Sequence, residues 1–459
     1  MPGGGTRLAA LRSWLRSGII RSIGVLVGGT ALAHGITAVA MPISTRLFTP
    51  ADFSAAAAFA SIVGILVVAA CLRFDMAIAL PEDDDEAINL LALSAASAIA
   101  VTLVVALALV VLPSTVLAGL RQPSLLPHLW LLPIAVLIGA MYLALQMWFV
   151  RRKRFGAIAR SRVVQSAAAA GGQIGLGALG HAPLGLIVGQ LLNYGAASVI
   201  LGWRVLIEER ALLKRVSLTG MVAAFRTHQR FPRYSVWEAL ANAAAIHAPI
   251  LLIAALAVGP EAGYLTLAIF LLQAPMALLG HAVGQVYLSG APEALREGRL
   301  AAYTMDILSG LLRSALAPLL FLAIVSPWAF EWVFGTGWAR AGVLVSWMAP
   351  WFLLQFVSSP ISSALHVTGR QRTAMALQIF GLVLRVGSVA LAGLAHPRFV
   401  AEVYAVSGAL FYGLYMVVVI GSVGGRVGEL GDALRKAAPS AFLTAIVGIA
   451  VVAALARLH

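Results

Sequence analysis

The chain has 459 residues, of which 61% are hydrophobic and 11% are charged, and its formal net charge at pH 7 is +14. An ordinary soluble domain has roughly a quarter of its residues charged, so this composition excludes a water-soluble fold. The single cysteine, Cys71, excludes an intramolecular disulfide, a CxxC pair and a cysteine-based zinc site.

Apolar stretches of about 20 residues recur from Ile19 to the end of the chain, and this length spans a bilayer as a helix. Stretches such as Val101–Leu112 do not alternate between apolar and polar residues, as the strands of a membrane β-barrel would. The sequence therefore predicts an all-α polytopic membrane protein with about thirteen spans. The expected spans are 22–47, 53–79, 87–112, 128–150, 163–181, 183–205, 234–258, 261–288, 303–330, 341–366, 373–395, 399–421 and 438–457.

The basic residues are distributed unevenly between the two sides of these spans. With the N-terminus inside, 25 of the 32 lysines and arginines fall in inner segments and five in outer ones. The positive-inside rule then predicts a cytoplasmic N-terminus, and it explains the basic excess without nucleic acid, which we do not expect as a partner. The first 21 residues are basic but lack a small-residue cleavage site, so we expect a cytoplasmic lead-in and not a signal peptide.

An internal repeat is indicated by three pairs of identical residues that share one offset of 213 positions. Six spans per half would give both halves the same orientation, with a central cleft between two lobes. The expected organisation is a lead-in at 1–21, an N-lobe at 22–205, an inter-lobe linker at 206–233, a C-lobe at 234–421, and a linker with one extra span at 422–459. The repeated pairs are Gly156 with Gly369, Gln165 with Gln378, and His34 with His247.

Charged residues inside the predicted spans are the first candidates for a binding site. A charge at the bilayer centre costs about 2.5 to 3.5 kcal/mol, so each requires a partner, water or a ligand. Arg313 and Arg385 lie mid-span, and Arg46 and Arg73 lie near span ends. A guanidinium keeps its proton and donates in a fork that fits phosphate, which favours an anionic ligand such as a phosphate ester. The rival interpretation is a structural ion pair, either Arg73 with Asp75 or Arg313 with Asp306.

Polar residues form stripes on several of the same spans, which indicates a hydrated interior. For any single Gln or Ser, helix-to-helix hydrogen bonding remains the simpler explanation. No His-x-x-x-His or His-x-x-Glu spacing accompanies the intramembrane histidines, so no metal is expected. The acidic run 82–86 is expected to be a solvated connector and helix cap. The stripes contain Gln165 and Gln173, Gln190 and Asn193, Glu238 and Asn242, Gln355, Ser359, Ser362 and His366, and Gln378 and Arg385.

The N-terminal part of the sequence resembles a known family. The segments that carry the resemblance are Gly29-Thr-Ala, Met41-Pro-Ile-Ser-Thr-Arg-Leu-Phe-Thr-Pro-Ala-Asp-Phe, Leu72-Arg-Phe-Asp-Met-Ala-Ile-Ala-Leu-Pro and Glu86-Ala-Ile-Asn-Leu. They resemble bacterial polysaccharide flippases, the Wzx-like branch of the superfamily that also contains multidrug exporters. The likeness is specific over roughly residues 25–95. Phe48, Ser54 and Asp75 depart from the family, which commonly has Tyr, Gly and Glu there.

The resemblance implies that the protein moves an undecaprenyl-diphosphate-linked oligosaccharide from the cytoplasmic to the periplasmic leaflet of the inner membrane. It implies alternating access by two lobes, no bond chemistry and therefore no enzyme, and a monomer without a cofactor. Polymerase and chain-length proteins are candidate partners, and protons or sodium are candidate coupling ions. Headgroup and sugar contacts are expected from Arg46, Arg73, Arg313, Arg385, Gln165, Asn242, Gln355 and Gln378, and ion coupling from Asp75, Glu238 or Asp306.

Two other functions remain open. A cation-coupled drug antiporter of the same superfamily would need a more acidic cavity, and the candidate arginines disfavour it. A membrane polysaccharide polymerase or ligase would need a large outer loop for its acceptor, whereas the longest outer connector here has about 15 residues. Covalent products formed when the purified protein is incubated with lipid-linked oligosaccharide would identify the enzyme.

Overall fold

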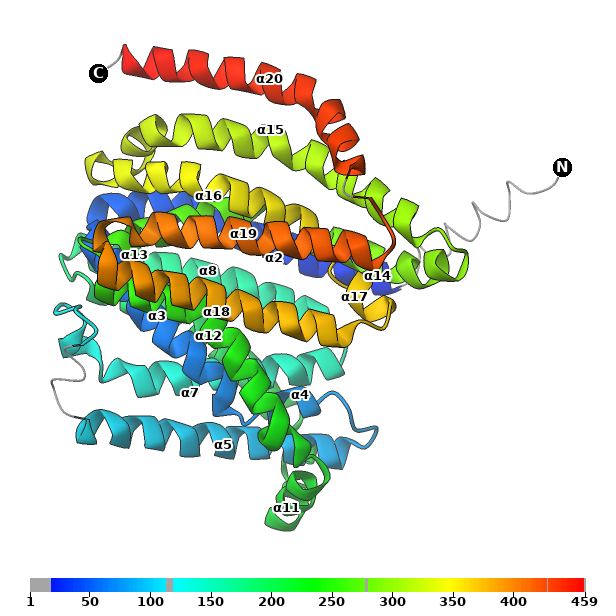
Figure 1. Cartoon of the computed structure of the whole chain (residues 1–459). Coiled ribbons are helices and arrows are strands. Elements are labelled where there is room, and N and C mark those ends of the chain that lie inside the picture. The colour runs from blue at the N-terminus through cyan, green and yellow to red at the C-terminus, as the bar shows by residue number, and fades with distance from the viewer. Residues whose placement is uncertain (1–17, 113–118, 277–279, 427, 458–459) are drawn as a thin grey trace. The chain divides into compact units, whose positions relative to one another are not determined.

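The computed structural model describes residues 18–112, 119–276, 280–426 and 428–457, and within those ranges the chain is helical with no β-strand. Figure 1 shows the long helices and the shorter segments that join them. The long helices in the first part of the chain are α2 (Gly18–Leu47), α3 (Pro50–Ala70), α5 (Asp84–Val111), α7 (Leu131–Arg151), α8 (Phe155–Ala178), α9 (Leu184–Glu208) and α12 (Val236–Leu256). Those in the second part are α13 (Glu261–Pro275), α14 (His281–Arg296), α15 (Leu300–Phe334), α16 (Ala339–Ser358), α18 (Gln371–Ala395), α19 (Val400–Ser422) and α20 (Glu429–Ala456).

Short helices join several of the long ones. They include the interrupted segment after α3 and the linker after α9, where the chain forms short helices before it enters α12. These are α4 (Phe74–Ala77), η1 (Leu126–His128), α10 (Arg210–Leu213), α11 (Leu218–Thr227), η2 (Phe231–Ser235), η4 (Thr336–Trp338), α17 (Ala364–Val367) and η5 (Pro397–Phe399).

Eleven helices within the described ranges are long and apolar enough to cross a membrane, which confirms the polytopic all-α prediction. Two of the thirteen predicted spans fall outside that set. The span predicted at 163–181 lies on α8, which also carries Arg160 and Arg162. In the span predicted at 261–288, α13 ends at Pro275, and residues 277–279 lie outside the described ranges. Most of the predicted lead-in, 1–17, lies outside the described residues.

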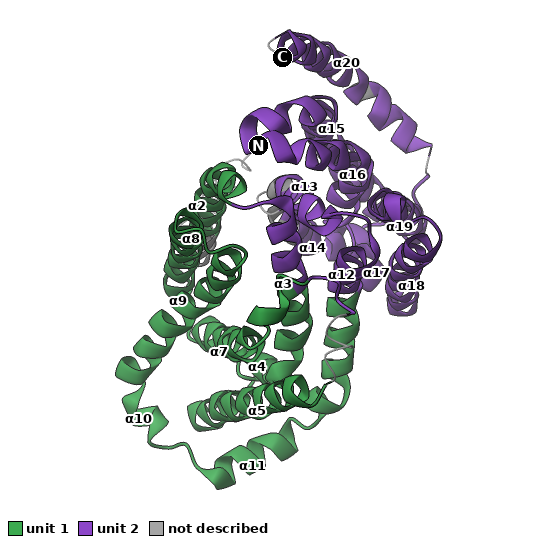
Figure 2. Cartoon of the chain, turned by 90° about the vertical axis from the view of Figure 1, so that its left-hand side faces the viewer, with its two compact units in different colours: residues 1–47, 59–118, 123–244 green, residues 48–58, 119–122, 245–459 purple. Residues whose placement is uncertain are grey.

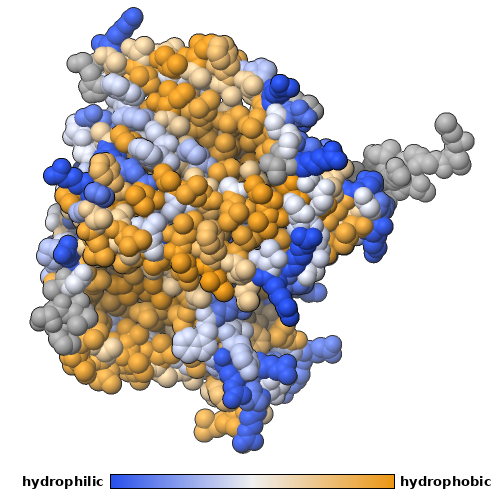
Figure 3. Space-filling model, viewed as in Figure 1, coloured by the Kyte–Doolittle hydropathy of each residue, from blue (hydrophilic) through white to orange (hydrophobic). Residues whose placement is uncertain are grey.

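Apolar side chains remain exposed along the helices, as a lipid environment requires. Val110 is 83% exposed, Leu394 80% and Phe442 71%. On the face shown in Figure 3, hydrophobic residues cover most of the helices, and hydrophilic residues gather toward the helix ends. Surfaces of this kind are unfavourable in water and face lipid in membrane proteins.

The chain divides into two units, coloured in Figure 2. In unit 1, residues 1–47, 59–118 and 123–244, α2 packs on α8, α8 on α9, and α7 on both α5 and α9. Its buried core surrounds Trp148 of α7, Phe74 of α4 and Ile88 of α5, all at most 1% exposed. A Cβ at Gly29 would lie 2.7 Å from the Ala159 Cβ, so a glycine there permits the close approach of α2 and α8.

Unit 2 contains residues 245–459 together with two short segments from the first half, 48–58 and 119–122. Helix α15 packs on α16 and α20, α16 packs on α13 and α19, and α18 packs on α19. Close backbone contact requires two glycines: a Cβ at Gly342 would lie 2.1 Å from the Ser326 carbonyl oxygen, and one at Gly263 would lie 2.0 Å from the Pro50 carbonyl oxygen. Residues 48–58, which are the turn before α3 and the first turns of α3, are thereby seated on α13 within this unit.

Candidate functional site

Arg385 is a buried cation in the middle of the membrane helix α18. It is 7% exposed, its Nε donates to the Gly381 carbonyl at 3.1 Å, and its guanidinium carbon lies 5.0 Å from the centroid of the Phe411 ring on α19. Within the described part of the chain, no carboxylate forms an ion pair with it. A backbone carbonyl and a ring face hold its orientation but do not neutralise its charge.

Arg313 and Asp306 share a face of α15 but do not pair, so the structural alternative proposed for them is wrong. Seven residues of helix separate them by about 10 Å along the axis, and no ion pair joins the two side chains in the described part of the chain. Both side chains are exposed. Arg46 is also exposed, near the end of α2.

Arg73 and Asp75 do form the alternative structural pair. They lie between α3 and α5, where Leu72 and Arg73 take positive φ values of 50° and 63°. The Arg73 Nη1 and Asp75 Oδ2 atoms are 4.0 Å apart, and Asp75 is 3% exposed. Burial raises the pKa of Asp75 above its ordinary value, and the nearby Arg73 offsets only part of that effect. The pair is therefore a poorly stabilised one, with Asp75 Oδ1 and Arg73 Nε buried without hydrogen-bond partners.

A polar cavity of about 160 Å³ lies inside unit 1, between α2, α8 and α9. Three carboxamides line it, from Gln173, Gln190 and Asn193. A Cβ at Gly189 would lie 2.3 Å from the Gln173 Cγ, so the glycine makes room for that side chain. The two polar stripes recognised in the sequence on α8 and α9 thus meet. Gln165 does not join this lining and is instead buried on α8, 7% exposed.

A second polar cavity, of about 450 Å³, lies in unit 2 at the end of α16. Gln355, Ser359 and Ser362 of the predicted stripe line it, together with Ser363, whereas His366 is not part of the lining. The Oε1 atom of Gln355 is buried without a hydrogen-bond partner. The stripe does not run on one continuous helix, because α16 ends at Ser358.

The other predicted polar residues are exposed on the membrane helices. Gln378 lies on α18, and Glu238 and Asn242 lie on α12. The predicted set is divided between the units: Arg46, Arg73, Asp75, Gln165, Glu238 and Asn242 belong to unit 1, and Asp306, Arg313, Gln355, Gln378 and Arg385 belong to unit 2.

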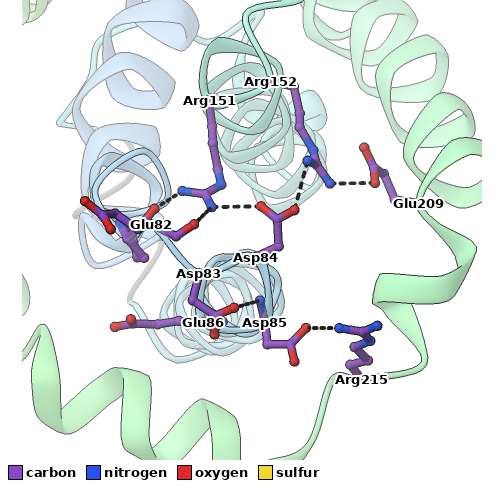
Figure 4. A network of polar contacts seen from close by, with 10 residues as sticks. Glu82, Asp83, Asp84, Asp85, Glu86, Arg151, Arg152, Glu209 and Arg215 are labelled. Carbon is purple, nitrogen blue, oxygen red and sulfur yellow. Dashed lines mark hydrogen bonds and ion pairs between the residues drawn. The ribbon is translucent and has the colours of Figure 1, made fainter.

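The acidic run at the start of α5 is an ion-pair network, and not only a solvated cap (Figure 4). Asp83 caps the helix as predicted, accepting from the Asp85 and Glu86 amides at 3.2 Å. Asp84 accepts from Arg151 at 2.8 Å and from Arg152 at 3.0 Å. The network extends to the linker before α12 through ion pairs of Arg152 with Glu209 and of Arg215 with Asp85, and through a hydrogen bond between His228 and Glu86, each at 2.9 Å.

Sequence reasoning missed one buried charge cluster, formed by Glu261, Arg340 and Glu402 in unit 2. The Arg340 Nε and Nη2 atoms donate to the two Glu261 oxygens at 3.0 and 3.1 Å, and Nη2 also donates to Glu402 Oε1 at 2.5 Å. The two glutamates are 7% and 9% exposed. The available signal was weak: each glutamate lies in the first turn of an apolar helix, but nothing in the sequence pairs them with Arg340.

No group of three or more His, Cys, Asp or Glu side chains that could hold a metal ion occurs among the residues described. The two polar cavities are lined by carboxamide and hydroxyl side chains, and Arg385 is a buried cation. Such groups bind anions and hydroxyl-rich molecules through hydrogen bonds.

Comparison with known proteins places the chain in a family and a fold class. The profile of the family described as "Polysaccharide biosynthesis protein" matches residues 43–342. The fold resembles that of solved MurJ and MATE-family structures. The chain belongs to this polysaccharide biosynthesis family. No curated protein sequence matches it.

The structural likeness covers nearly the whole chain at low sequence identity. The lipid II flippase MurJ, in an inward closed conformation, has a TM-score of 0.70 at 11% identity, with 96% of this chain and 98% of that chain covered. An inward-facing MATE-family multidrug resistance transporter has a TM-score of 0.56 at 16% identity, covering 95% and 99%. A MOP superfamily transporter from Pyrococcus furiosus has a TM-score of 0.52 at 14% identity, covering 88% and 96%. These likenesses show the fold.

Proposed function

We propose that the protein is a flippase that carries an undecaprenyl-diphosphate-linked oligosaccharide from the cytoplasmic to the periplasmic leaflet for surface polysaccharide synthesis. The family and the MOP-type fold support transport in polysaccharide biosynthesis. The observation that carries the substrate assignment is Arg385, a buried membrane arginine without a carboxylate partner in the described ranges.

A diphosphate headgroup supplies the negative partner that the Arg385 guanidinium lacks. An uncompensated charge at membrane depth costs about 2.5 to 3.5 kcal/mol, and a bound phosphate offsets that cost through charge-assisted hydrogen bonds. Arg313 is a second cation of unit 2 for the same headgroup, since no acidic side chain of the described residues pairs with it. A cationic drug would be repelled by both side chains.

The two polar cavities suit the saccharide. A carboxamide both donates and accepts hydrogen bonds, as each sugar hydroxyl does. Gln173, Gln190 and Asn193 provide such groups in unit 1, and Gln355 provides one in unit 2 together with serine hydroxyls. The polyprenyl tail requires no site, because it remains in lipid.

The same proposal covers the cellular setting. The bias of basic residues supports an inner-membrane protein with its N-terminus in the cytoplasm. The protein acts as a monomer without a cofactor, makes no covalent bond, and works beside polymerase and chain-length proteins. Asp75 is the strongest of the three predicted coupling residues, because burial raises its pKa while Glu238 and Asp306 are exposed.

Translocation in proteoliposomes tests the proposal. A fluorescent undecaprenyl-diphosphate oligosaccharide in the inner leaflet becomes accessible to an external quencher only after it is flipped. We expect the wild type and Arg372→Gln, an exposed position on the same helix α18, to flip the lipid, and Arg385→Gln to lose most of the rate. Equal rates for the two variants would refute the headgroup assignment, and an inactive wild type would refute the function.

A further inference from the structure

The Glu261, Arg340 and Glu402 cluster contains two buried carboxyl groups and one guanidinium. If both carboxyls were ionised, the cluster would carry a net charge of −1, with both glutamates buried and the Arg340 side chain 29% exposed. Buried charges are tolerated only when they are paired, and two carboxylates that share a single cation disfavour double ionisation. The described residues place no second cation in the cluster.

The hydrogen bonds distinguish the two glutamates. Glu261 uses both oxygens to receive the guanidinium fork, at 3.0 and 3.1 Å, which is the arrangement of a full carboxylate pair. Glu402 receives Arg340 on Oε1 alone, and its Oε2 is buried without any hydrogen-bond partner. An unpartnered buried carboxylate oxygen is far less costly as the hydroxyl of a neutral acid.

We propose that Glu261, Arg340 and Glu402 form a proton-binding site in unit 2, occupied by one proton on the Oε2 atom of Glu402. With that proton, the cluster is neutral: Arg340 pairs with the Glu261 carboxylate, and the carbonyl oxygen of Glu402 accepts its remaining hydrogen bond. A proton is the ligand that fits, because a metal ion needs several oxygen ligands and only one oxygen is free.

The other titratable and charged groups on the elements around the cluster do not supply the missing charge. Tyr264, one turn along α13, is in electrostatic contact with Glu261 and Arg340 but is neutral near pH 7. Asp52 on α3 accepts hydrogen bonds from the Thr49 amide and hydroxyl, at 2.8 and 2.7 Å. Arg398 on η5 is exposed.

The position of the cluster links its proton to the seating of residues 48–58. Gly263, whose Cα approaches the Pro50 carbonyl, follows Glu261 by two residues. Trp338, which precedes Arg340 by two residues, packs edge-on against Phe53 with ring centroids 4.9 Å apart. Loss of the proton places an unbalanced negative charge beside this packing. This link to the transport cycle rests on the proposed function, whereas the protonation of the cluster does not.

Infrared spectroscopy of the protein in nanodiscs at neutral pH tests the protonation directly. The wild type should show the carbonyl stretch of a buried protonated carboxylic acid. Measured in an Asp75→Asn background, which removes the other buried carboxyl group with a raised pKa, Glu402→Gln should abolish that band. Glu261→Gln should abolish it too, because either change leaves one carboxylate for one guanidinium. The exposed matched control, Glu429→Gln, should retain it. A wild type without the band, or a band that persists in both cluster variants, would overturn the proposal.

A transport measurement separates this inference from the proposed function. Glu402→Gln imitates the protonated acid permanently, so flipping by this variant should no longer respond to a pH gradient across the proteoliposome membrane, whereas the wild type should respond. An equal response in both proteins would overturn the link to transport. A protonated wild type that flips no lipid would instead refute the function and leave the proton site standing.

Discussion

Replacing Gly381 by alanine should displace the ring that holds Arg385 without changing any charge. A Cβ at this position would lie 2.4, 2.7 and 2.8 Å from three carbon atoms of the Phe411 ring. Carbon atoms pack at about 3.5 to 4.0 Å, so the ring must move by about 1 Å. Overpacking of this kind costs about 1 to 3 kcal/mol, and Arg385 would lose the orientation that its ring contact maintains.

Gly387 on the same helix provides the matched control. No atom lies within 4 Å of a Cβ built there, so alanine fits and gains up to about 1 kcal/mol of helix propensity. The two variants should differ in unfolding temperature and in affinity for undecaprenyl diphosphate. Gly381→Ala should unfold at a lower temperature and bind the lipid more weakly, by about tenfold for each 1.4 kcal/mol of binding free energy lost. Indistinguishable unfolding temperatures and affinities would refute the packing argument and the positioning of Arg385.

Three further changes test other parts of the structure. Because burial raises the pKa of Asp75, the folded state keeps the Asp75 proton to a higher pH than the unfolded state, and stability falls as the pH rises through that interval. Asp75→Asn should therefore flatten the pH dependence of the unfolding temperature and should raise the unfolding temperature at neutral pH. The exposed control Asp432→Asn should do neither. Arg152→Gln should lower the free energy of unfolding by about 1 kcal/mol at low salt and by less at high salt, because the ion pairs of Arg152 with Asp84 and Glu209 are partly solvated. A loss of stability that does not depend on salt would contradict this. Gly342→Ala should lower the unfolding temperature strongly, since its Cβ would meet backbone at 2.1 Å, and a variant as stable as the wild type would show that α15 and α16 separate easily.

The membrane helices could be predicted from the sequence because hydropathy over about 20 residues depends only on local composition. The breaks inside the predicted spans could not. The span predicted at 53–79 ends as α3 at Ala70, because Leu72 and Arg73 take left-handed conformations that the apolar pattern does not reveal. At 341–366, α16 likewise ends at Ser358 before Pro360, which disfavours helix in the residue before it.

The charge pairs show a second limit of sequence reasoning. The predicted stripes on α8 and α9 meet at one cavity, whereas the stripe predicted over 355–366 is broken where α16 ends at Ser358. A shared helical face also does not bring charges into contact, as Asp306 and Arg313 show. Ion pairs between segments far apart in the sequence could not be predicted. Arg151 pairs with Asp84, 67 positions away, and Arg340 pairs with Glu261, 79 positions away. Such contacts follow from helix packing, which one sequence without its fold does not specify.

The most direct test of the account is the affinity of the protein in nanodiscs for undecaprenyl diphosphate compared with uncharged undecaprenol. We predict that the wild type binds the diphosphate more tightly and that Arg385→Gln removes most of this difference, while Arg372→Gln preserves it. Equal affinities of the wild type for the two lipids, or a preference for the diphosphate that survives Arg385→Gln unchanged, would contradict the claim that this buried arginine receives an anionic carrier lipid.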